Sequence, residues 1–449
     1  MSSKIKNKYS FLLFWWIKFV HDVLYYRKTY VRRVAHTLPK DSPCVIACNH
    51  QNSLNDAMAI ILTMHRRKIW FLARADIFSG KIQKKFLNSL GVLPVYRQRD
   101  GFSNLKNNFD IFDKAEKYLL NGCLICLYPE AKHQDRHYLG QFYLSYIRLA
   151  FNAAAAADFT KEVFILPCAN HYSDYFAIQS DILINYGTPI SLVPYYELYR
   201  TNPRLAQEQV NKLVHSKVDE LMLNIQDTEN YDAIYNLLNN VGNDYAYAQH
   251  VNAKKLPDKL RIDQYIVKQL ENLKVNDIAC FNAICQTSEQ YSILQKRYQL
   301  TDNCIAKPYS LFKIVYMFIG FVATFCIFVL GFIHHIIPYL IPKIVSRNIK
   351  DPLLKPSFDL AIITLVTIPI FYIIYGVILS ILFHCFWITL VYLIALPFCG
   401  IFTCWWLRYA INWFNMLKTK FFKHFRRSIW ETLQGTRLHL RDMLFKVLQ

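Results

Sequence analysis

Charged residues are scarce in this chain, and acidic ones are the scarcest. Asp, Glu, Lys and Arg together make up 19% of the 449 residues, against about 25% in an average soluble domain. Hydrophobic residues make up 53%, which excludes a disordered chain because disorder requires low hydrophobicity. The length excludes a disulfide-stapled miniprotein and indicates two or three domains. The net charge of +20 leaves a membrane-associated protein or a basic nucleic-acid binder.

Three further absences narrow the function. Cys123 and Cys126 have the spacing of a metal site, but no second pair or histidine cluster accompanies them, so no metal site is expected. Lys18 interrupts the apolar run Phe11–Ile17 after seven residues, so no cleavable signal peptide is expected. The Gly-x-Ser-x-Gly motif is missing, which argues against an esterase of that class.

The positive charge is concentrated at the two ends of the chain. Residues 1–40 carry a net charge of +8 and residues 408–449 one of +7. In both segments the cations alternate with large apolar side chains, which is typical of a segment lying in the interface of an anionic membrane. A nucleic-acid-binding arm is usually polar between its cations. We therefore expect an interfacial segment at 1–40, a basic amphipathic tail at 408–449, membrane lipids as partners and no nucleic acid.

Residues 41–195 alternate short apolar runs with amphipathic stretches, which predicts an α/β domain with helices flanking a mainly parallel sheet. The expected strands are Cys44–Cys48, Ile69–Leu72, Leu93–Val95, Leu124–Tyr128, Val163–Pro167 and Ile182–Tyr186. Helices are expected at Phe109–Leu120 and Gln141–Ala157, among others. Residues 196–308 show only helical patterns and are expected to form an arm that either packs on the domain or takes part in substrate binding.

Residues 309–407 contain long uncharged runs that predict C-terminal transmembrane helices. A span requires about 20 apolar residues, and the runs predict spans at about 314–337, 360–383 and 386–407. A tight turn near His384 would join the last two. The basic segments on either side of this hairpin place both of its ends in the cytoplasm. The first run could either cross the membrane or re-enter it.

The first candidate site follows the strand Cys44–Cys48, in the sequence Asn49-His50-Gln51-Asn52-Ser53-Leu54-Asn55-Asp56. Parallel-sheet enzymes bind ligands beyond the carboxyl ends of their strands, so His50 could act as a general base with Asp56 orienting its ring. Residues six apart do not share a helix face. His50 would therefore lie in the turn before a helix, with Asp56 in its first turn. Alternatively, Ser53-x-x-Asp56 is a capping box and His50 an ordinary loop residue.

Two other expected strands lead to arginines. Leu93–Val95 is followed by Arg97 and Arg99, and Ile69–Leu72 is followed by Arg74. The forked guanidinium group suits phosphate oxygens, which indicates a phosphorylated substrate. Solvated surface charge would give the same pattern.

Two more blocks lie at expected strand ends. Tyr128-Pro129-Glu130 follows an apolar strand and would place a carboxylate beside the first block if the sheet is parallel. Ile165-Leu166-Pro167 is predicted to be a strand that stops at its proline.

These four blocks, in this order, resemble those of the glycerolipid acyltransferase (PlsC-like) family, over roughly residues 25–195. The resemblance implies transfer of a fatty acyl group, without a cofactor, from acyl-CoA or acyl carrier protein to a hydroxyl of 1-acylglycerol-3-phosphate in phospholipid biosynthesis. His50 would be the general base and Asp56 its orienting partner. The logic is that of a Ser-His-Asp triad in which the substrate hydroxyl replaces the serine.

The resemblance also suggests how the acceptor is held. Arg97 and Glu130 would bind its glycerol-phosphate end, and Pro167 would shape a wall of the pocket. The remaining expected substrate-binding residues are Asn49, Pro129, Arg74 and Arg99.

The spacing of the first block departs from the common family pattern. Five residues rather than four separate His50 from Asp56, and Asn55 stands at the usual aspartate position. The longer spacing resembles some bacterial members and fungal-type glycerol-3-phosphate/dihydroxyacetone-phosphate acyltransferases. We therefore keep Asp56 as the partner and expect the turn to absorb the extra residue.

The third block departs at two positions. Ala131 replaces the glycine that usually follows the glutamate, and His133 stands in place of an arginine, which leaves Lys132 or Arg136 to supply the charge. Glycerol-3-phosphate, dihydroxyacetone phosphate and a lyso-aminolipid stay open as acceptors, and a catalytically inactive membrane scaffold is the non-enzyme alternative. The predicted location is a membrane crossed several times, with the catalytic domain on the cytoplasmic face, and a bacterial inner membrane is the expected compartment.

Overall fold

The computed structural model describes residues 11–33, 38–39, 41–64, 67–78, 80–96, 106–130, 135–307 and 309–449. The chain forms two compact units. The first contains the chain up to Leu223 together with Ile349–Phe358. The second contains Asn224–Asn348 and Asp359–Gln449.

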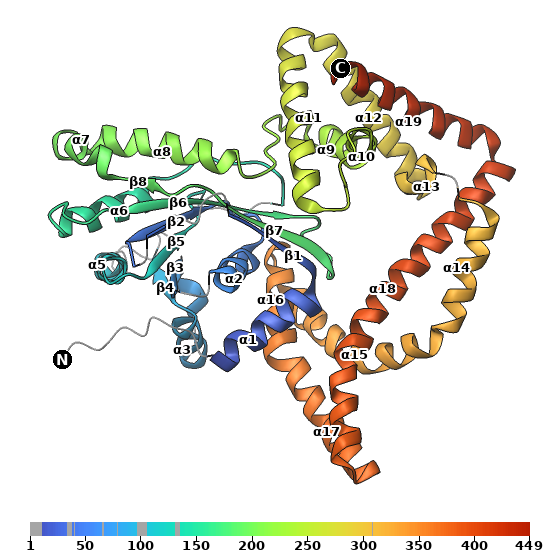
Figure 1. Cartoon of the computed structure of the whole chain (residues 1–449), viewed down its shortest axis with the longest axis horizontal. Coiled ribbons are helices and arrows are strands. Elements are labelled where there is room, and N and C mark those ends of the chain that lie inside the picture. Colours follow the sequence, from blue (N-terminus) through green and yellow to red (C-terminus); the bar gives the residue numbers. More distant parts are fainter. Residues whose placement is uncertain are drawn as a thin grey trace. The chain divides into compact units, whose positions relative to one another are not determined.

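A mixed sheet of eight strands, counted over the described residues, forms the centre of the first unit (Figure 1). The strands are β1 (Tyr26–Arg33), β2 (Cys44–Cys48), β3 (Ile69–Arg74), β4 (Val92–Val95), β5 (Leu124–Leu127), β6 (Phe164–Tyr172), β7 (Ser180–Tyr186) and β8 (Ile190–Ser191). Their order is β1-β7-β6-β2-β5-β3-β4, with β8 beside β6. Only β7 and β8 run antiparallel to their partner β6. The prediction of a mainly parallel sheet with flanking helices is confirmed.

Helices cover both faces of this sheet (Figure 1). They are α1 (Phe11–Phe19), α2 (Ser53–Thr63), α3 (Lys81–Ser89), α5 (Asn107–Leu120), α6 (Ser145–Ala156), α7 (Tyr196–Thr201) and α8 (Pro203–Asp219). Odd-numbered residues of β2, β5 and β6 share a hydrophobic core with α5, α6 and α8. Because side chains alternate along a strand, the even-numbered residues face the opposite side, where α2 lies. The residues of β2, β5 and β6 are all buried, as expected for strands covered on both faces.

The prediction that the fourth-block strand stops at Pro167 is wrong, because β6 continues to Tyr172. Along one side β6 pairs first with β8 and then, from Cys168 onward, with β7. Pro167 lies between these two partners, and its carbonyl accepts the N–H of Gly187 at 2.9 Å. The N–H and C=O of one residue point to the same side of a strand, so the N–H that proline lacks would face this gap.

The expectation that residues 1–40 form one interfacial segment is wrong for Tyr26–Arg33. This segment is β1, an edge strand that pairs in parallel with β7. Its arginines and lysine are exposed, as is common on sheet edges that must not pair with other chains. The apolar helix α1 precedes it and leaves Phe11 and Leu12 exposed to 73% and 80%.

The expected boundary at residue 195 also needs correction. α8 buries Ala206, Val210, Val214 and Val218 in the same core as β2, β5 and β6. The amphipathic pattern of residues 203–219 was predicted correctly as a helix, but its apolar face covers the sheet. The separate helical part of the chain therefore begins at Asn224.

The second unit is helical throughout its described residues. Its helices are α9 (Tyr231–Asn239), α10 (Gly242–Ala248), α11 (Leu256–Asn276), α12 (Ile278–Tyr298), α13 (Asp302–Ala306), α14 (Leu311–Ala323), α15 (Phe325–Val345), α17 (Ile368–Phe383), α18 (Phe386–Phe425) and α19 (Arg427–Val447), while α16 (Leu354–Ile362) begins in the first unit and continues into the second. The expected amphipathic tail is largely α19, but its Arg437 is buried and pairs with Asp244 and Asp302. This part of the tail therefore packs against protein.

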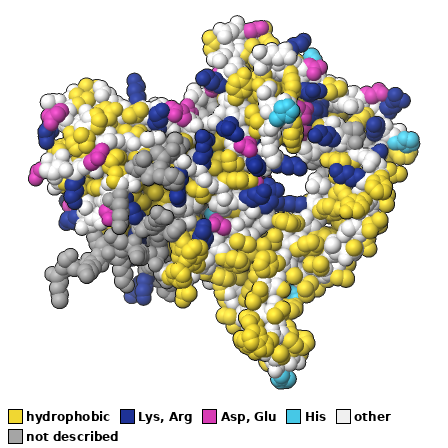
Figure 2. All heavy atoms as spheres, in the orientation of Figure 1, with side chains coloured by type: hydrophobic (Ala, Val, Ile, Leu, Met, Phe, Trp, Pro, Cys, Tyr) yellow, Lys and Arg dark blue, Asp and Glu magenta, His cyan; other side chains and the backbone are white. Residues whose placement is uncertain are grey.

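Three helices in the described part of the chain are long and apolar enough to cross a membrane: Phe325–Asn348, Leu354–Phe383 and Phe386–Phe425. Figure 2 shows hydrophobic side chains gathered over α17 and the adjoining parts of α15 and α18. The expected turn near His384 is confirmed, since His384 adopts a left-handed conformation between α17 and α18. The expected span 314–337 is wrong in its bounds. The helix breaks at Thr324, whose hydroxyl donates to the Gly320 carbonyl at 2.7 Å, a contact that tends to bend helices.

Candidate active site

His50 and Asp56 meet at the carboxyl end of β2. His50 lies in the turn before α2, Asp56 lies in the first turn of that helix, and 2.9 Å separates His50 Nδ1 from Asp56 Oδ2. Asp56 is fully buried, whereas 18% of the His50 side chain is exposed. The Tyr128 ring stacks on the imidazole with ring centroids 4.1 Å apart. Hydrogen bonding of Nδ1–H to a carboxylate makes Nε2 the proton-accepting nitrogen of the ring.

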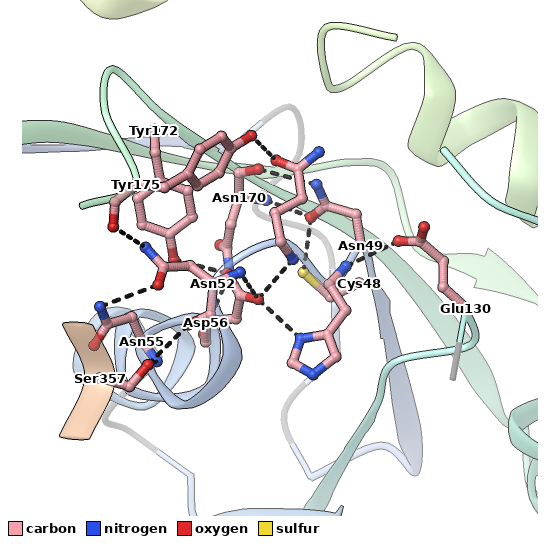
Figure 3. Close-up of polar contacts among 12 residues, drawn as sticks. Cys48, Asn49, Asn52, Asn55, Asp56, Glu130, Asn170, Tyr172, Tyr175 and Ser357 are labelled. Atoms are coloured by element: carbon pink, nitrogen blue, oxygen red, sulfur yellow. Dashed lines mark hydrogen bonds and ion pairs between the residues drawn. The ribbon is translucent and has the colours of Figure 1, made fainter. Parts of the chain in front are cut away.

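Asp56 gathers hydrogen bonds on both of its carboxylate oxygens (Figure 3). Besides His50, Oδ2 accepts the backbone N–H groups of Gln51 and Asn52 at 2.9 and 2.8 Å. Oδ1 accepts the Tyr172 hydroxyl at 2.7 Å and the Asn170 amide at 3.3 Å. Asn52 is the N-cap residue of α2, so the carboxylate both caps the helix and orients the histidine. The predicted capping box at Ser53 is not formed, because the N-cap residue is Asn52 and its side chain makes no capping hydrogen bond.

The additional residue of this block is accommodated in the turn. Ser53, the first residue of α2, has a φ of +48°, a left-handed conformation that is unfavourable for residues with a Cβ. This kink lets Asp56 turn back toward the Asn52 N–H and His50. Strained backbone of this kind occurs at functional sites, where the surroundings hold it in place.

Glu130 contacts the backbone of His50. Its Oε1 accepts the His50 N–H and its Oε2 accepts the Gly140 N–H, both at 2.9 Å. Burial raises the pKa of Glu130, and the two backbone N–H groups and His50 only partly oppose that effect. A Cβ at Gly140 would lie 3.1 Å from Glu130 Oε2. The neighbouring Pro129 is buried and its carbonyl accepts the N–H of Tyr143 at 2.9 Å.

Asn49 joins β2 to β6. Its amide donates to the Asn170 carbonyl at 3.0 Å and its carbonyl oxygen accepts the Asn170 N–H at 2.8 Å. Asn49 is fully buried, so the structure places it as a clamp between strands. Pro167 lies at an odd-numbered position of β6, on the face opposite to Asn170 and Tyr172. Substrate contacts of Asn49 and Pro167 stay predictions.

The predicted phosphate-binding arginines are only partly described. Arg74 ends β3 and is exposed at the carboxyl edge of the sheet, where it pairs with Val95 of β4. Arg97 and Arg99 lie outside the described residues. Tyr96, which precedes them, is held by Asn108 of α5, which donates to its carbonyl at 2.8 Å and accepts its N–H at 2.9 Å.

The positions after Glu130 that depart from the family pattern are also only partly described. Ala131, Lys132 and His133 lie outside the described residues. Arg136 is exposed, and its carbonyl accepts the Gln51 side-chain amide at 3.1 Å.

A set of polar residues from β6 and the loop after it is not predicted by the sequence patterns. Asn170 and Tyr172 contact Asp56, and the Tyr175 hydroxyl donates to Gln51 Oε1 at 2.9 Å and lies 3.0 Å from His137 Nδ1. The signal was an even-numbered series continuing past Pro167. The predicted strand ends at Pro167 and therefore does not include these positions.

Comparison with known proteins identifies the part of the chain that carries this site. Residues 31–171 match the family model described as Acyltransferase. Glycerol-3-phosphate O-acyltransferase 2 of Saccharomyces cerevisiae is 28% identical over 129 residues, which are 28% of this chain and 17% of that protein. The chain therefore matches less than a fifth of that curated relative's length. The matched segment contains His50, Asp56, Glu130 and Asn170 in one polar arrangement, and the family model identifies it as an acyltransferase domain.

Proposed function

We propose that this chain is a membrane-bound O-acyltransferase of glycerolipid synthesis. The observation that carries the proposal is the His50–Asp56 pair, 2.9 Å apart and with both carboxylate oxygens held by further donors. A buried carboxylate fixed in this way stabilises the imidazolium that forms when the histidine takes a proton. His50 is the partly exposed member of the pair and therefore the one that meets substrate.

The proposed reaction is a direct acyl transfer. Nε2 of His50 removes the proton from the acceptor hydroxyl as its oxygen attacks the thioester carbonyl of acyl-CoA or acyl carrier protein. The carbon–sulfur bond then breaks, and the departing thiolate takes up the proton from His50. An ester and a free thiol are the products, and neither an enzyme serine nor a bound cofactor takes part.

Two observations favour glycerol-3-phosphate as the acceptor. The relative that matches this chain is named a glycerol-3-phosphate O-acyltransferase, and five residues separate His50 from Asp56, as in the fungal-type enzymes that the block resembles. We retain 1-acylglycerol-3-phosphate as the second candidate, because it presents the same glycerol-phosphate end. Arg97, Arg74, Arg99 and Glu130 are the proposed groups around that end.

The test is a radiolabelled acyl-donor assay on the full-length chain in lipid nanodiscs. Glycerol-3-phosphate, dihydroxyacetone phosphate, 1-acylglycerol-3-phosphate and a lyso-aminolipid would be compared as acceptors. We expect turnover with a phosphorylated acceptor, abolished in His50→Ala and intact in the matched control His424→Ala, which changes an exposed histidine of α18. Turnover that survives His50→Ala would refute the assignment of the base, and the lack of turnover with any acceptor would favour the scaffold alternative.

A second measurement tests acceptor recognition. Arg97→Ala should raise KM for the phosphorylated acceptor far more than KM for the acyl donor, because a guanidinium fork recognises phosphate oxygens. Equal changes in both KM values would contradict this role.

We also infer that the chain crosses the membrane several times, with the acyltransferase domain on the cytoplasmic face. The hairpin of Leu354–Phe383 and Phe386–Phe425 and the excess of Lys and Arg after residue 407 support this topology. In this topology Phe325–Asn348 re-enters the membrane instead of crossing it, since Ile349–Phe358 belongs to the same unit as the acyltransferase domain. A tag placed after Gln449 should be protected from protease added outside intact cells and cleaved after permeabilisation. Cleavage of the tag in intact cells would show that the C-terminal tail lies outside the cytoplasm and would contradict the proposed topology.

A further inference from the structure

A segment far outside the matched acyltransferase domain packs beside the candidate active site. Ile349–Phe358 belongs to the first unit, although the chain before it, from Asn224 onward, belongs to the second. Leu353, Pro356 and Ser357 of this segment are buried. The Tyr25 hydroxyl donates to the Pro356 carbonyl at 3.1 Å. The segment is therefore part of the catalytic unit, even though it follows the first candidate membrane span and its residues from Leu354 onward begin the second.

Ser357 contacts the first turn of α2 (Figure 3). Its hydroxyl donates to the Asn52 carbonyl at 3.2 Å and accepts the Asn55 N–H at 3.3 Å. The Asn52 side chain does not cap its own helix. Its oxygen accepts the Asn55 side-chain amide at 3.4 Å, and its amide donates to the Tyr175 carbonyl at 3.3 Å. A helix begins with N–H groups that need outside acceptors. The Asn55 N–H donates to the Asn52 carbonyl at 2.9 Å, and Ser357, 302 positions further along the chain, is a second acceptor for it.

The turn that Ser357 holds is the turn that positions Asp56. Asp56 Oδ2 accepts the Asn52 N–H, while Ser357 binds the carbonyl of the same residue. Between Asn52 and Asn55 lies Ser53, with its left-handed φ of +48°. A backbone conformation that is unfavourable by itself must be held by its surroundings, and here Asp56 holds it from one side and Ser357 from the other.

We propose that Ser357 is a positioning residue for acyl transfer. It fixes the Asn52–Asn55 turn so that Asp56 presents Oδ2 to His50 Nδ1. The proposal rests on the proposed function of the His50–Asp56 pair. It means that residues 31–171 do not complete their own active site, because a segment located beyond the first candidate span supplies a contact that this turn requires.

The test uses Ser357→Ala in the full-length chain in nanodiscs. We expect kcat to fall about tenfold, the effect of losing a buried hydrogen bond that holds a reacting group, with both KM values unchanged. Ser357→Cys keeps a side chain of similar size and a weak donor, so its kcat should lie between those of the wild type and Ser357→Ala. The matched control is Ser346→Ala, at a serine buried in the second unit, and it should leave kcat unchanged.

A double variant separates positioning from a general loss of structure. If Ser357 acts through Asp56, adding Ser357→Ala to Asp56→Asn should cause no further loss of activity, because the interaction is already broken. A merely structural role would multiply the two losses. Multiplied losses, a rise of KM in step with the fall of kcat, or an equal loss in Ser346→Ala would each overturn the proposal.

Hydrogen exchange provides a readout that does not depend on turnover. Ser357→Ala should speed amide exchange in residues 51–56 while leaving the β6 peptide protected. Unchanged protection of residues 51–56 would overturn the proposal whatever the activity. Absence of wild-type turnover with every acceptor, together with faster exchange in the variant, would instead refute the proposed function and retain Ser357 as the residue that holds this turn.

Discussion

The hydroxyl of Tyr172 donates a 2.7 Å hydrogen bond to Oδ1 of Asp56, the carboxylate oxygen that does not face His50. Tyr172 comes from the far end of β6, 116 positions away from Asp56, and is buried. The carboxylate therefore cannot rotate without breaking contacts on both oxygens. This relationship explains how one aspartate can cap a helix and hold a histidine ring in a single orientation.

Replacing Tyr172 with Phe should lower kcat about tenfold with little change in either KM. The ring keeps its packing, but a hydrogen bond to a charged group, worth about 1.5–3 kcal/mol, is lost. Steady-state kinetics of full-length protein would measure the effect. Tyr26→Phe is the matched control, at a buried tyrosine whose ring lies 6.2 Å from that of Tyr172. Equal losses in both variants would show that the loss does not come from the hydrogen bond to Asp56.

Glu130→Gln should lower kcat about tenfold or more at neutral pH, because the glutamine NH2 would face a backbone N–H that now lacks its acceptor. The ratio of wild-type to variant kcat should shrink as the pH falls. Burial raises the pKa of Glu130 above its ordinary value of 4.5, so the folded wild type takes up this proton at a higher pH than an exposed glutamate and then loses the same acceptor. Profiles of kcat against pH would test this.

Glu162→Gln, at an exposed glutamate, is the control for the Glu130 experiment and should follow the wild-type profile. A ratio of wild-type to Glu130→Gln kcat that stays constant at every pH would contradict the assigned protonation. The stability of the protein should also depend on this group. Because the folded-state pKa of Glu130 is raised, its ionisation makes folding less favourable as the pH rises through that range.

Ser53→Gly should retain activity and raise the temperature of unfolding, whereas Ser53→Val should lower it. A left-handed residue with a Cβ costs about 1–2 kcal/mol, and glycine removes that cost at the expense of some unfolded-state entropy. Differential scanning fluorimetry in detergent would measure the shift. Ser145→Gly, at the right-handed start of α6, should be slightly destabilising. A Ser53→Gly variant no more stable than Ser145→Gly would argue against strain at this turn.

Arg437→Ala should loosen α19 without the chemistry of the active site being involved. The guanidinium donates to Asp302 at 2.8 and 3.0 Å and pairs with Asp244 at 2.8 Å. Removing one partner of a buried pair costs about 3–5 kcal/mol because the remaining charges lose their compensation. Limited proteolysis should release α19 faster. Arg427→Ala breaks an exposed pair with Glu431, and this variant should be cleaved at the wild-type rate. Equal rates of cleavage in the two variants would refute the expectation.

Local patterns in the sequence were enough to locate most of the sheet and the core of the candidate site. The run Cys44–Cys48 is a strand with those bounds, and the other predicted strands overlap β3–β7. Short apolar runs bounded by turn residues are typical of buried strands. The six-residue separation of His50 and Asp56 excluded a shared helix face, and the structure places them in the turn and first helical turn that this geometry required.

Edges and partners could not be found in this way. The cations of β1 indicated a membrane interface, and only pairing with β7, about 150 positions away, makes this segment a strand. The apolar face of α8 predicts a helix, but it does not indicate that this face packs on the sheet of the first unit. A proline in an apolar run predicts a strand end, and only the tertiary structure shows that Pro167 lies at the gap between the partner strands β7 and β8.

The sequence by itself therefore determined most of the strands, the last two candidate spans, the turn at His384 and the identity of the His50–Asp56 pair, because each depends on residues close together in the chain. The tertiary structure alone decided what holds that pair. Tyr172, Asn170 and Ser357 reach the Asp56 turn from 114 to 305 positions away. A hydrogen bond across such a distance leaves no local periodicity, since it depends only on where folding brings the two segments together.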